Sequence, residues 1–141
     1  MTSNSKNKVV FSHIIKMLEY DALQSPDPRK KVAACIIDSD GNVLAKAFNS
    51  RPEQDPNYLD CVAPGGMSDP SLIHAEEKCL LQLRTDLPRE SLTMFITHCA
   101  CKRCASRIYY SGIRTIVYAG DHDNGEGGEY FRSLGGITFQ I

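Results

Sequence analysis

The sequence predicts an α/β protein in which one mixed five-stranded sheet lies between two layers of helices. Three observations support this three-layer α/β/α prediction. Helical apolar patterns and short β-rich runs alternate in the order α-β-β-α-β-α-β-α-β, which is typical of a sheet covered on both faces. An Asp-Gly pair between the first two β-rich runs indicates a hairpin. At 141 residues the chain is long enough for one core, so we expect residues 1–141 to form a single domain.

The first part of the chain predicts a helix followed by the hairpin. Apolar residues recur at every fourth position from 10 to 22, which marks one face of a helix over residues 9–23 and leaves residues 1–8 as a flexible N-terminus. The prolines of "SPDPR" then end the helix, because proline disfavours helix in the residue before it. Strands are expected over residues 32–38 and 43–48.

A long loop and a second helix follow. Residues 50–70 contain four prolines and no periodic pattern, so we expect a functional loop on the substrate side of the domain. Asp69 and Pro70 then resemble a helix start, with an acceptor side chain at the N-cap and proline at the first position. The predicted helix runs to about residue 84 and carries His74 in its opening turns.

The rest of the chain alternates strands with helices. We expect strands over residues 91–97, 114–119 and 136–141, and helices over residues 101–112 and 129–134. The glycine-rich stretch "GEGGE" at 125–129 lacks the G-x-x-x-x-G-K-[ST] pattern of a phosphate-binding loop, so it predicts a flexible turn.

Charge and hydropathy argue against two classes of partner. The chain has 16 Lys and Arg against 17 Asp and Glu, so it lacks the global positive field that binds a polynucleotide. No run approaches 18 apolar residues, and the first residues lack the apolar core of a secretion signal. We therefore expect a cytoplasmic protein that binds neither a membrane nor a polynucleotide.

The cysteines point to a metal site. Three of the six fall within "CACKRC", and clustered cysteines in a cytoplasmic chain favour metal binding over disulfides. Cys101 and Cys104 stand where a predicted strand gives way to a helix, and the free N–H groups of a helix N-terminus favour thiolates. A catalytic zinc takes three protein ligands and keeps one position for water. His74 is the nearest plausible third ligand, with Glu76 beside the open position.

These residues resemble a known family. The H-A-E triplet at 74–76, followed by C-K-R-C at 101–104, is similar to the signature of the zinc-dependent cytidine and deoxycytidylate deaminase superfamily. Residues 25–49, 104–118 and 131–140 also resemble its deoxycytidylate branch, so the resemblance covers nearly the whole chain from about residue 9. It implies a cytidine-deaminase-like fold and the hydrolytic deamination of a pyrimidine nucleotide, with dCMP converted to dUMP and ammonia.

The resemblance also implies residue roles. Zn²⁺ is expected on His74, Cys101 and Cys104, with Glu76 moving the protons. Substrate contacts are implied for three further positions, namely the Asn49 side chain, Ala75 and the carbonyl of Cys99. For a phosphate, Arg51 is the first candidate because it closely follows Asn49, whereas lone surface cations such as Arg29, Lys102 and Arg103 are usually solvated.

Two positions depart from the family pattern. The family has proline before the first cysteine of C-x-x-C, where this chain has Ala100, so a backbone restraint is missing. It also has glycine where this chain has Ala33, and the extra methyl group either narrows the pocket or packs in the core.

Several alternatives remain open from the sequence. Cytidine, cytosine, guanine and tRNA adenosine deaminases share this core, and a zinc-binding regulatory module without catalysis would carry the same ligands. The 24 residues between Asn49 and His74 favour the small-nucleotide substrate over tRNA. Cys99 could close the zinc site as a fourth ligand, and Cys61 with His98 could form a second metal site. Cys35 and Cys79 are best explained as buried apolar residues. The resemblance implies a homo-oligomer, either a dimer or a hexamer.

Overall fold

The computed structural model describes residues 4–61, 69–120 and 125–141. Its helices and strands follow the predicted alternation. In chain order they are α1 (Asn4–Ala22), β1 (Ala33–Ile37), β2 (Val43–Phe48), α2 (Ala75–Gln82), β3 (Thr93–Ile96), α3 (Lys102–Tyr110), β4 (Thr115–Tyr118), α4 (Glu126–Ser133) and β5 (Ile137–Gln140), with a 3-10 turn at Arg89–Ser91 before β3.

The five strands form one sheet in the order β2-β1-β3-β4-β5. β1 pairs antiparallel with both β2 and β3, whereas β3, β4 and β5 run parallel to one another. The predicted mixed five-stranded sheet is therefore confirmed. Because β1 and β3 are antiparallel, the start of β1 lies beside the end of β3, and this shared edge is where the site is built.

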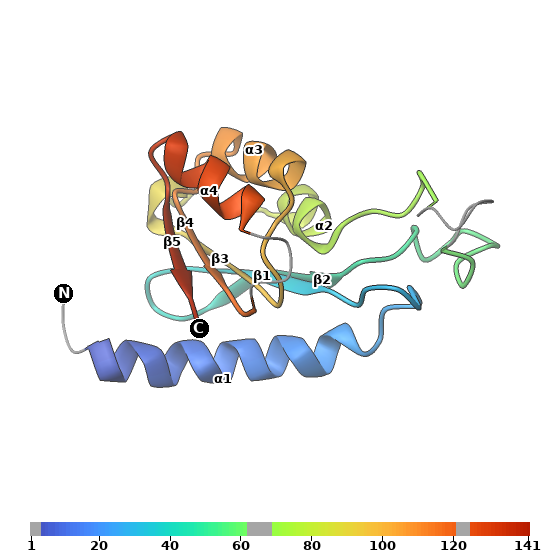
Figure 1. Cartoon of the computed structure of the whole chain (residues 1–141), viewed down its shortest axis with the longest axis horizontal. Coiled ribbons are helices and arrows are strands. Elements are labelled where there is room, and N and C mark those ends of the chain that lie inside the picture. Colours follow the sequence, from blue (N-terminus) through green and yellow to red (C-terminus); the bar gives the residue numbers. More distant parts are fainter. Residues whose placement is uncertain (1–3, 62–68, 121–124) are drawn as a thin grey trace.

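Helices cover both faces of the sheet, with α1 on one side and α2, α3 and α4 on the other (Figure 1). The buried residues of β1 divide between the two sides as a pleated strand requires. Ala33, Cys35 and Ile37 pack with α1, whereas Ala34 and Ile36 pack with the other helices. The three-layer architecture is confirmed, and the methyl group of Ala33 packs under α1.

Two predicted helix starts differ from the structure. α1 begins at Asn4, five residues before the predicted start at residue 9. Of the predicted flexible N-terminus, residues 4–8 are therefore helical, and residues 1–3 lie outside the described residues. α2 begins at Ala75 rather than near Asp69. The backbone of Ile73 pairs with that of Ser50 in a bridge, with N–H to carbonyl distances of 2.9 and 3.2 Å, which holds the chain extended until His74.

The prediction of a flexible turn over residues 125–129 is wrong. Gly125 is the N-cap of α4, with a φ of 69°, and the glycines that follow it form the first turn of that helix. The predicted loop over residues 50–70 has no helix or strand in its described part, and residues 62–68 lie outside the described residues. None of the described helices is long and apolar enough to span a membrane.

Candidate metal centre

The structure brings together the three residues that the sequence predicts as metal ligands. His74 is the N-cap of α2, Cys101 is the N-cap of α3, and Cys104 lies in the first turn of α3. The Nδ1 atom of His74 is 3.2 Å from the Sγ atom of Cys104 and 3.8 Å from that of Cys101. All three ligand atoms lie within 4.8 Å of one another. Two helix N-termini therefore converge on one point.

This donor set fits a zinc ion. Tetrahedral zinc binds sulfur at about 2.3 Å and nitrogen at about 2.0–2.1 Å, which puts neighbouring ligand atoms roughly 3.6–3.8 Å apart. The separation of 3.8 Å between His74 and Cys101 falls in this range, and that of 3.2 Å between His74 and Cys104 is about 0.4 Å shorter. Within residues 4–61, 69–120 and 125–141, no fourth His, Cys, Asp or Glu joins the group. Three ligands of this type match a catalytic zinc site better than a closed structural one.

The contacts around the two cysteines shift the pKa values of their thiols in opposite directions. Two hydrogen bonds lower the pKa of the Cys101 thiol to about 3, and the one with Cys104 has a larger effect than the one with His74. The backbone N–H of Cys104 also points at the Cys101 sulfur, at an N–S distance of 3.5 Å. The hydrogen bond with Cys101 raises the pKa of the Cys104 thiol in turn. Cys101 is therefore the sulfur of this pair that accepts hydrogen bonds.

Glu76 lies in the second position of α2 and is 5% exposed. Burial raises the pKa of its carboxyl group. The Glu76 carboxyl group is not among the three candidate metal ligands, yet Glu76 lines the same cavity as His74 and Cys101. A carboxyl group beside a metal centre and out of bulk water can accept and return protons, which is the role that the sequence predicts for it.

The cavity has a volume of about 120 Å³, and two of the candidate metal ligands, His74 and Cys101, are in its lining. Its walls come from the segment before β1, from the start of α2 and from the end of β3. The lining residues are Asp27, Lys30, Val32, Asn49, Leu72, His74, Ala75, Glu76, His98, Cys99 and Cys101. Three of the predicted substrate contacts, Asn49, Ala75 and Cys99, are therefore in the cavity wall.

Asn49 is buried, and its side chain holds the wall in place. Its Oδ1 atom accepts from the backbone N–H of Val32 at 2.9 Å, and its Nδ2 atom donates to the carbonyl of Lys30 at 2.8 Å. A longer contact of 3.5 Å joins Nδ2 to the buried carboxyl group of Asp27. The amide thus ties the end of β2 to the segment that enters β1.

Cys99 is buried, and its thiol lies outside the ligand group. The thiol donates to the carbonyl of Ala100 at 3.6 Å. A Cβ atom added at Gly128 of α4 would lie 3.5 Å from its sulfur. Cys99 is not within reach of the three ligand atoms, so it does not close the site as a fourth ligand.

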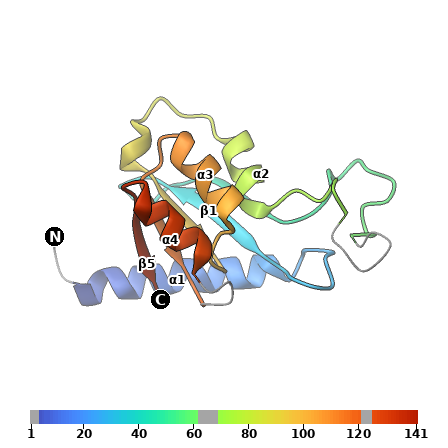
Figure 2. The same cartoon turned by 45° about the horizontal axis from the view of Figure 1, so that its top comes forward.

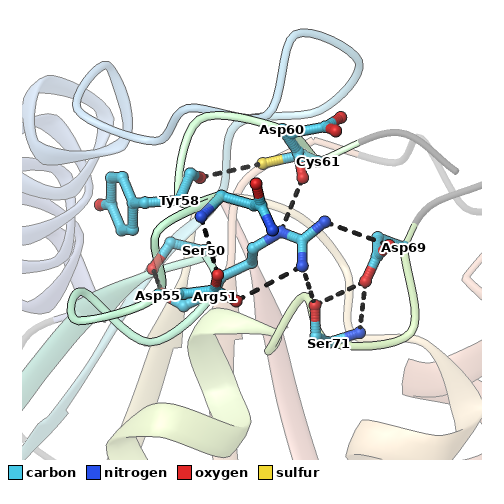
Figure 3. A network of polar contacts seen from close by, with 9 residues as sticks. Ser50, Arg51, Asp55, Tyr58, Asp60, Cys61, Asp69 and Ser71 are labelled. Atoms are coloured by element: carbon cyan, nitrogen blue, oxygen red, sulfur yellow. Dashed lines mark hydrogen bonds and ion pairs between the residues drawn. The ribbon is translucent and has the colours of Figure 1, made fainter.

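The structure places Arg51 in a network inside its own loop (Figure 3). The guanidinium donates to the carbonyl of Asp60 and to the hydroxyl of Ser71, each at 2.6 Å. It also pairs with the carboxylates of Asp69, at 3.1 Å, and Asp55, at 3.4 Å. Arg51 does not line the cavity, so its geometry supports loop structure rather than a phosphate contact.

Cys61 and His98 are not brought into a second metal group. Cys61 is buried in the loop, where its thiol is 3.9 Å from the carbonyl of Tyr58. His98 instead lines the cavity. Across the described part of the chain, neither residue belongs to a group of three metal-type ligands.

Asp27 and Lys30 are cavity residues that sequence reasoning missed. They stand in "SPDPRKK", directly before β1, where the prolines indicated only the end of a helix. Their place in the site depends on β1 pairing with β3, which is far away in the sequence. The sequence offers one local signal, which is an acidic and a basic residue just before β1. The start of β1 lies beside the end of β3, which leads to the cysteines.

Comparisons with known proteins agree with the fold and place the chain in a zinc-binding family. The family model described as the cytidine and deoxycytidylate deaminase zinc-binding region matches residues 6–120. A human deoxycytidylate deaminase is 26% identical over 132 residues, covering 84% of this chain and 71% of the human protein. The deoxycytidylate deaminase of Saccharomyces cerevisiae is 27% identical over 136 residues, covering 90% of this chain and 43% of the yeast protein.

One solved structure matches along its whole length. It is a dCMP deaminase from the cyanophage S-TIM5, in complex with dCMP and dUMP. The two folds superpose with a TM-score of 0.85 over 100% of both chains, at 21% sequence identity. The likeness shows that the two chains share a fold.

Proposed function

We propose that this chain is a zinc-dependent deaminase that converts dCMP to dUMP and releases ammonia. The proposal starts from its family, because the chain belongs to the cytidine and deoxycytidylate deaminase family. One observation carries this proposal. The His74, Cys101 and Cys104 ligand atoms converge beside a cavity whose wall also contains the buried carboxyl group of Glu76. A zinc ion held by these three residues would lower the pKa of a water molecule and so supply the nucleophile.

The protein's own residues then direct the protons. Glu76 takes one proton from the attacking water and passes it to N3 of the cytosine ring. It then takes the remaining proton from the oxygen added at C4 and delivers it to the amino group, which leaves as ammonia while the C4 carbonyl forms. Its burial keeps bulk water from competing for those protons. The carbonyl of Cys99 accepts a hydrogen bond from the amino group, and the backbone of Ala75 contacts the base. Both residues line the cavity.

We assign the nucleotide end of the substrate to Lys30, His98 and Asp27, which also line this cavity. A phosphate needs cationic donors, and Lys30 and His98 line the same cavity as the metal ligands. The buried carboxyl group of Asp27 is an acceptor for a sugar hydroxyl. Lys30 therefore replaces Arg51 as the proposed phosphate contact, because the Arg51 guanidinium is held by its own loop. The relatives named above as deoxycytidylate deaminases also favour a nucleotide substrate.

A substrate panel tests this proposal. The zinc-loaded protein is assayed for ammonia release from dCMP, deoxycytidine, cytidine, cytosine, guanine and a tRNA anticodon stem-loop. We expect dCMP to give the highest kcat/KM. Activity on cytidine with none on dCMP would overturn the substrate and leave the mechanism in place. Bound zinc without ammonia from any compound would instead favour a regulatory zinc module.

We also propose that the chain forms a homo-oligomer. A groove between α2 and α3 exposes apolar side chains, including Leu81, which is 70% exposed, and Tyr110, which is 93% exposed. A second copy of the chain would remove this surface from water. Light scattering on the wild type and on a Leu81→Ser, Tyr110→Ser variant tests the assignment. A wild type that is monomeric at assay concentrations would refute it.

A further inference from the structure

α4 lies so close to the backbone of Ala100 and Cys101 that residue 127 has no room for a side chain. The two helices α3 and α4 lie side by side (Figure 2). A Cβ atom at residue 127 would lie 1.7 Å from the carbonyl oxygen of Ala100 and 2.5 Å from its carbonyl carbon. It would also lie 2.9 Å from the carbonyl carbon of Cys101. These neighbours are backbone atoms, so no side-chain rotation relieves the overlap.

The segment under Gly127 carries a proposed zinc ligand. The peptide between Ala100 and Cys101 leads directly into the N-cap of α3, and its position sets where the Cys101 sulfur points. Ala100 is 2% exposed and has the ordinary backbone freedom of alanine, so packing must fix this peptide. Gly127, which is buried on α4, forms the surface against which the peptide rests.

Intrinsic propensity does not explain the glycine. Within a helix, glycine is less favourable than alanine by roughly 0.5–1 kcal/mol. Gly127 has no positive φ that would require glycine. The close backbone approach is therefore the physical reason for glycine at this position.

Gly128 provides a matched comparison in the same turn of the same helix. A Cβ atom there would meet only the ends of side chains, namely the Tyr118 hydroxyl at 3.2 Å, an Arg132 guanidinium nitrogen at 3.3 Å and the Cys99 sulfur at 3.5 Å. Small shifts of those groups accommodate a methyl group. Both glycines are buried, so the two substitutions differ in what the new methyl group meets.

We propose that Gly127 is a positioning residue for the metal centre. Its missing side chain lets α4 pack on the Ala100–Cys101 peptide and thereby fixes the direction of the Cys101 thiolate. A methyl group at this position would displace either α4 or the peptide, and the ligand would move with the peptide. The identity of the metal as zinc rests on the proposed function, whereas the packing contact does not.

The test compares Gly127→Ala with Gly128→Ala in the full chain. Zinc affinity is measured by competition with a chromogenic chelator, and ligand geometry by the absorption spectrum of the cobalt-substituted protein. Removing a group that orients a ligand typically weakens metal binding 10–100-fold. We expect Gly127→Ala to lose at least about tenfold in zinc affinity and to change the cobalt spectrum. Gly128→Ala should stay within about threefold of the wild type.

Each outcome decides the proposal. Wild-type zinc affinity with an unchanged cobalt spectrum in Gly127→Ala would overturn it. A Gly127→Ala chain that is unfolded without zinc but folds with excess zinc would support the proposal. A Gly127→Ala chain that is unfolded in both conditions would count against it, because the contact would then stabilise the whole fold. A wild type that binds no zinc would refute the proposed function and remove the basis of this inference with it. If Gly127→Ala lost zinc affinity and the wild type had no deaminase activity, the positioning role of Gly127 would be supported and the proposed function refuted.

Discussion

Replacing Arg51 with alanine separates two roles for this residue, a phosphate contact and a clamp within the loop. The substitution removes hydrogen bonds of 2.6 Å to the Asp60 carbonyl and the Ser71 hydroxyl. It also leaves the carboxylates of Asp55 and Asp69 without the cation that now lies between them. Because this loop leads into the bridge between Ser50 and Ile73, its loosening should reach the start of α2.

The expected loss of stability follows from these contacts. A hydrogen bond that involves a charged group contributes about 1.5–3 kcal/mol. The Arg51 side chain is only 10% exposed, but the side chains of Asp55 and Asp69 are 21% and 24% exposed, so water compensates part of the loss. We therefore expect the free energy of unfolding to fall by roughly 2–4 kcal/mol, below the sum of the separate hydrogen bonds.

The assay is urea unfolding at a fixed concentration of free zinc, because bound metal adds to apparent stability. Arg84→Ala is the matched control, since Arg84 is exposed and donates only to nearby carbonyl groups, and it should change stability by less than about 0.5 kcal/mol. The clamp also predicts that Arg51→Ala lowers kcat/KM for dCMP and deoxycytidine by the same factor. A selective loss on dCMP with unchanged stability would refute the clamp and restore the phosphate contact.

Four further predictions follow from single side chains. Lys30→Met should raise KM for dCMP about 10–100-fold and leave deoxycytidine turnover unchanged; equal effects on both substrates would contradict its phosphate role. Cys79→Ala should cost about 1–2 kcal/mol of stability by urea unfolding and retain one zinc per chain by metal analysis, because its thiol is buried against the Ala34 carbonyl at 3.2 Å. Phe131→Ala should lower stability by about 3–5 kcal/mol, and a loss below about 1 kcal/mol would argue against its place in the core. Burial raises the pKa of the Cys35 thiol to about 12, so at pH 8 its reactive thiolate form is rare and mass spectrometry should find this residue unmodified after native alkylation.

The layers and the cluster of candidate metal ligands were predictable because their signals are local. β1 and β2 are apolar runs around an Asp-Gly turn, and the structure pairs them as a hairpin. Cys101 and Cys104 stand at a strand-to-helix junction that the sequence marks directly. A residue type, a spacing and a local structural context are enough to identify such a site.

The start of α2 was mispredicted because the residue that resembles an N-cap, Asp69, makes other contacts in the folded loop. Asp69 resembles an N-cap, but its carboxylate accepts from the backbone of Ser71 and pairs with Arg51, eighteen positions away in the sequence. His74 takes the N-cap position, where its backbone N–H donates to Glu77 at 3.4 Å. A propensity rule cannot anticipate a partner that only the folded loop provides.

The glycines of α4 show the same limit. Low helix propensity predicts a turn for "GEGGE", and tertiary packing overrides it because Gly127 lies against the backbone of Ala100. The cavity wall at Lys30 was likewise not readable from the sequence, because it forms only when β1 lies beside β3. In each case the missing information is a contact between distant parts of the chain.

The central claim is that bound zinc and the Glu76 carboxyl group act together in deamination, and a Glu76→Gln variant tests it most directly. Zinc content and ammonia release from dCMP are measured on the same preparations of variant and wild type. The three ligands remain in the variant, so we expect one zinc per chain in both proteins and a kcat about 10²–10⁴-fold lower in the variant. A zinc-loaded variant that deaminates dCMP as fast as the wild type would contradict the claim.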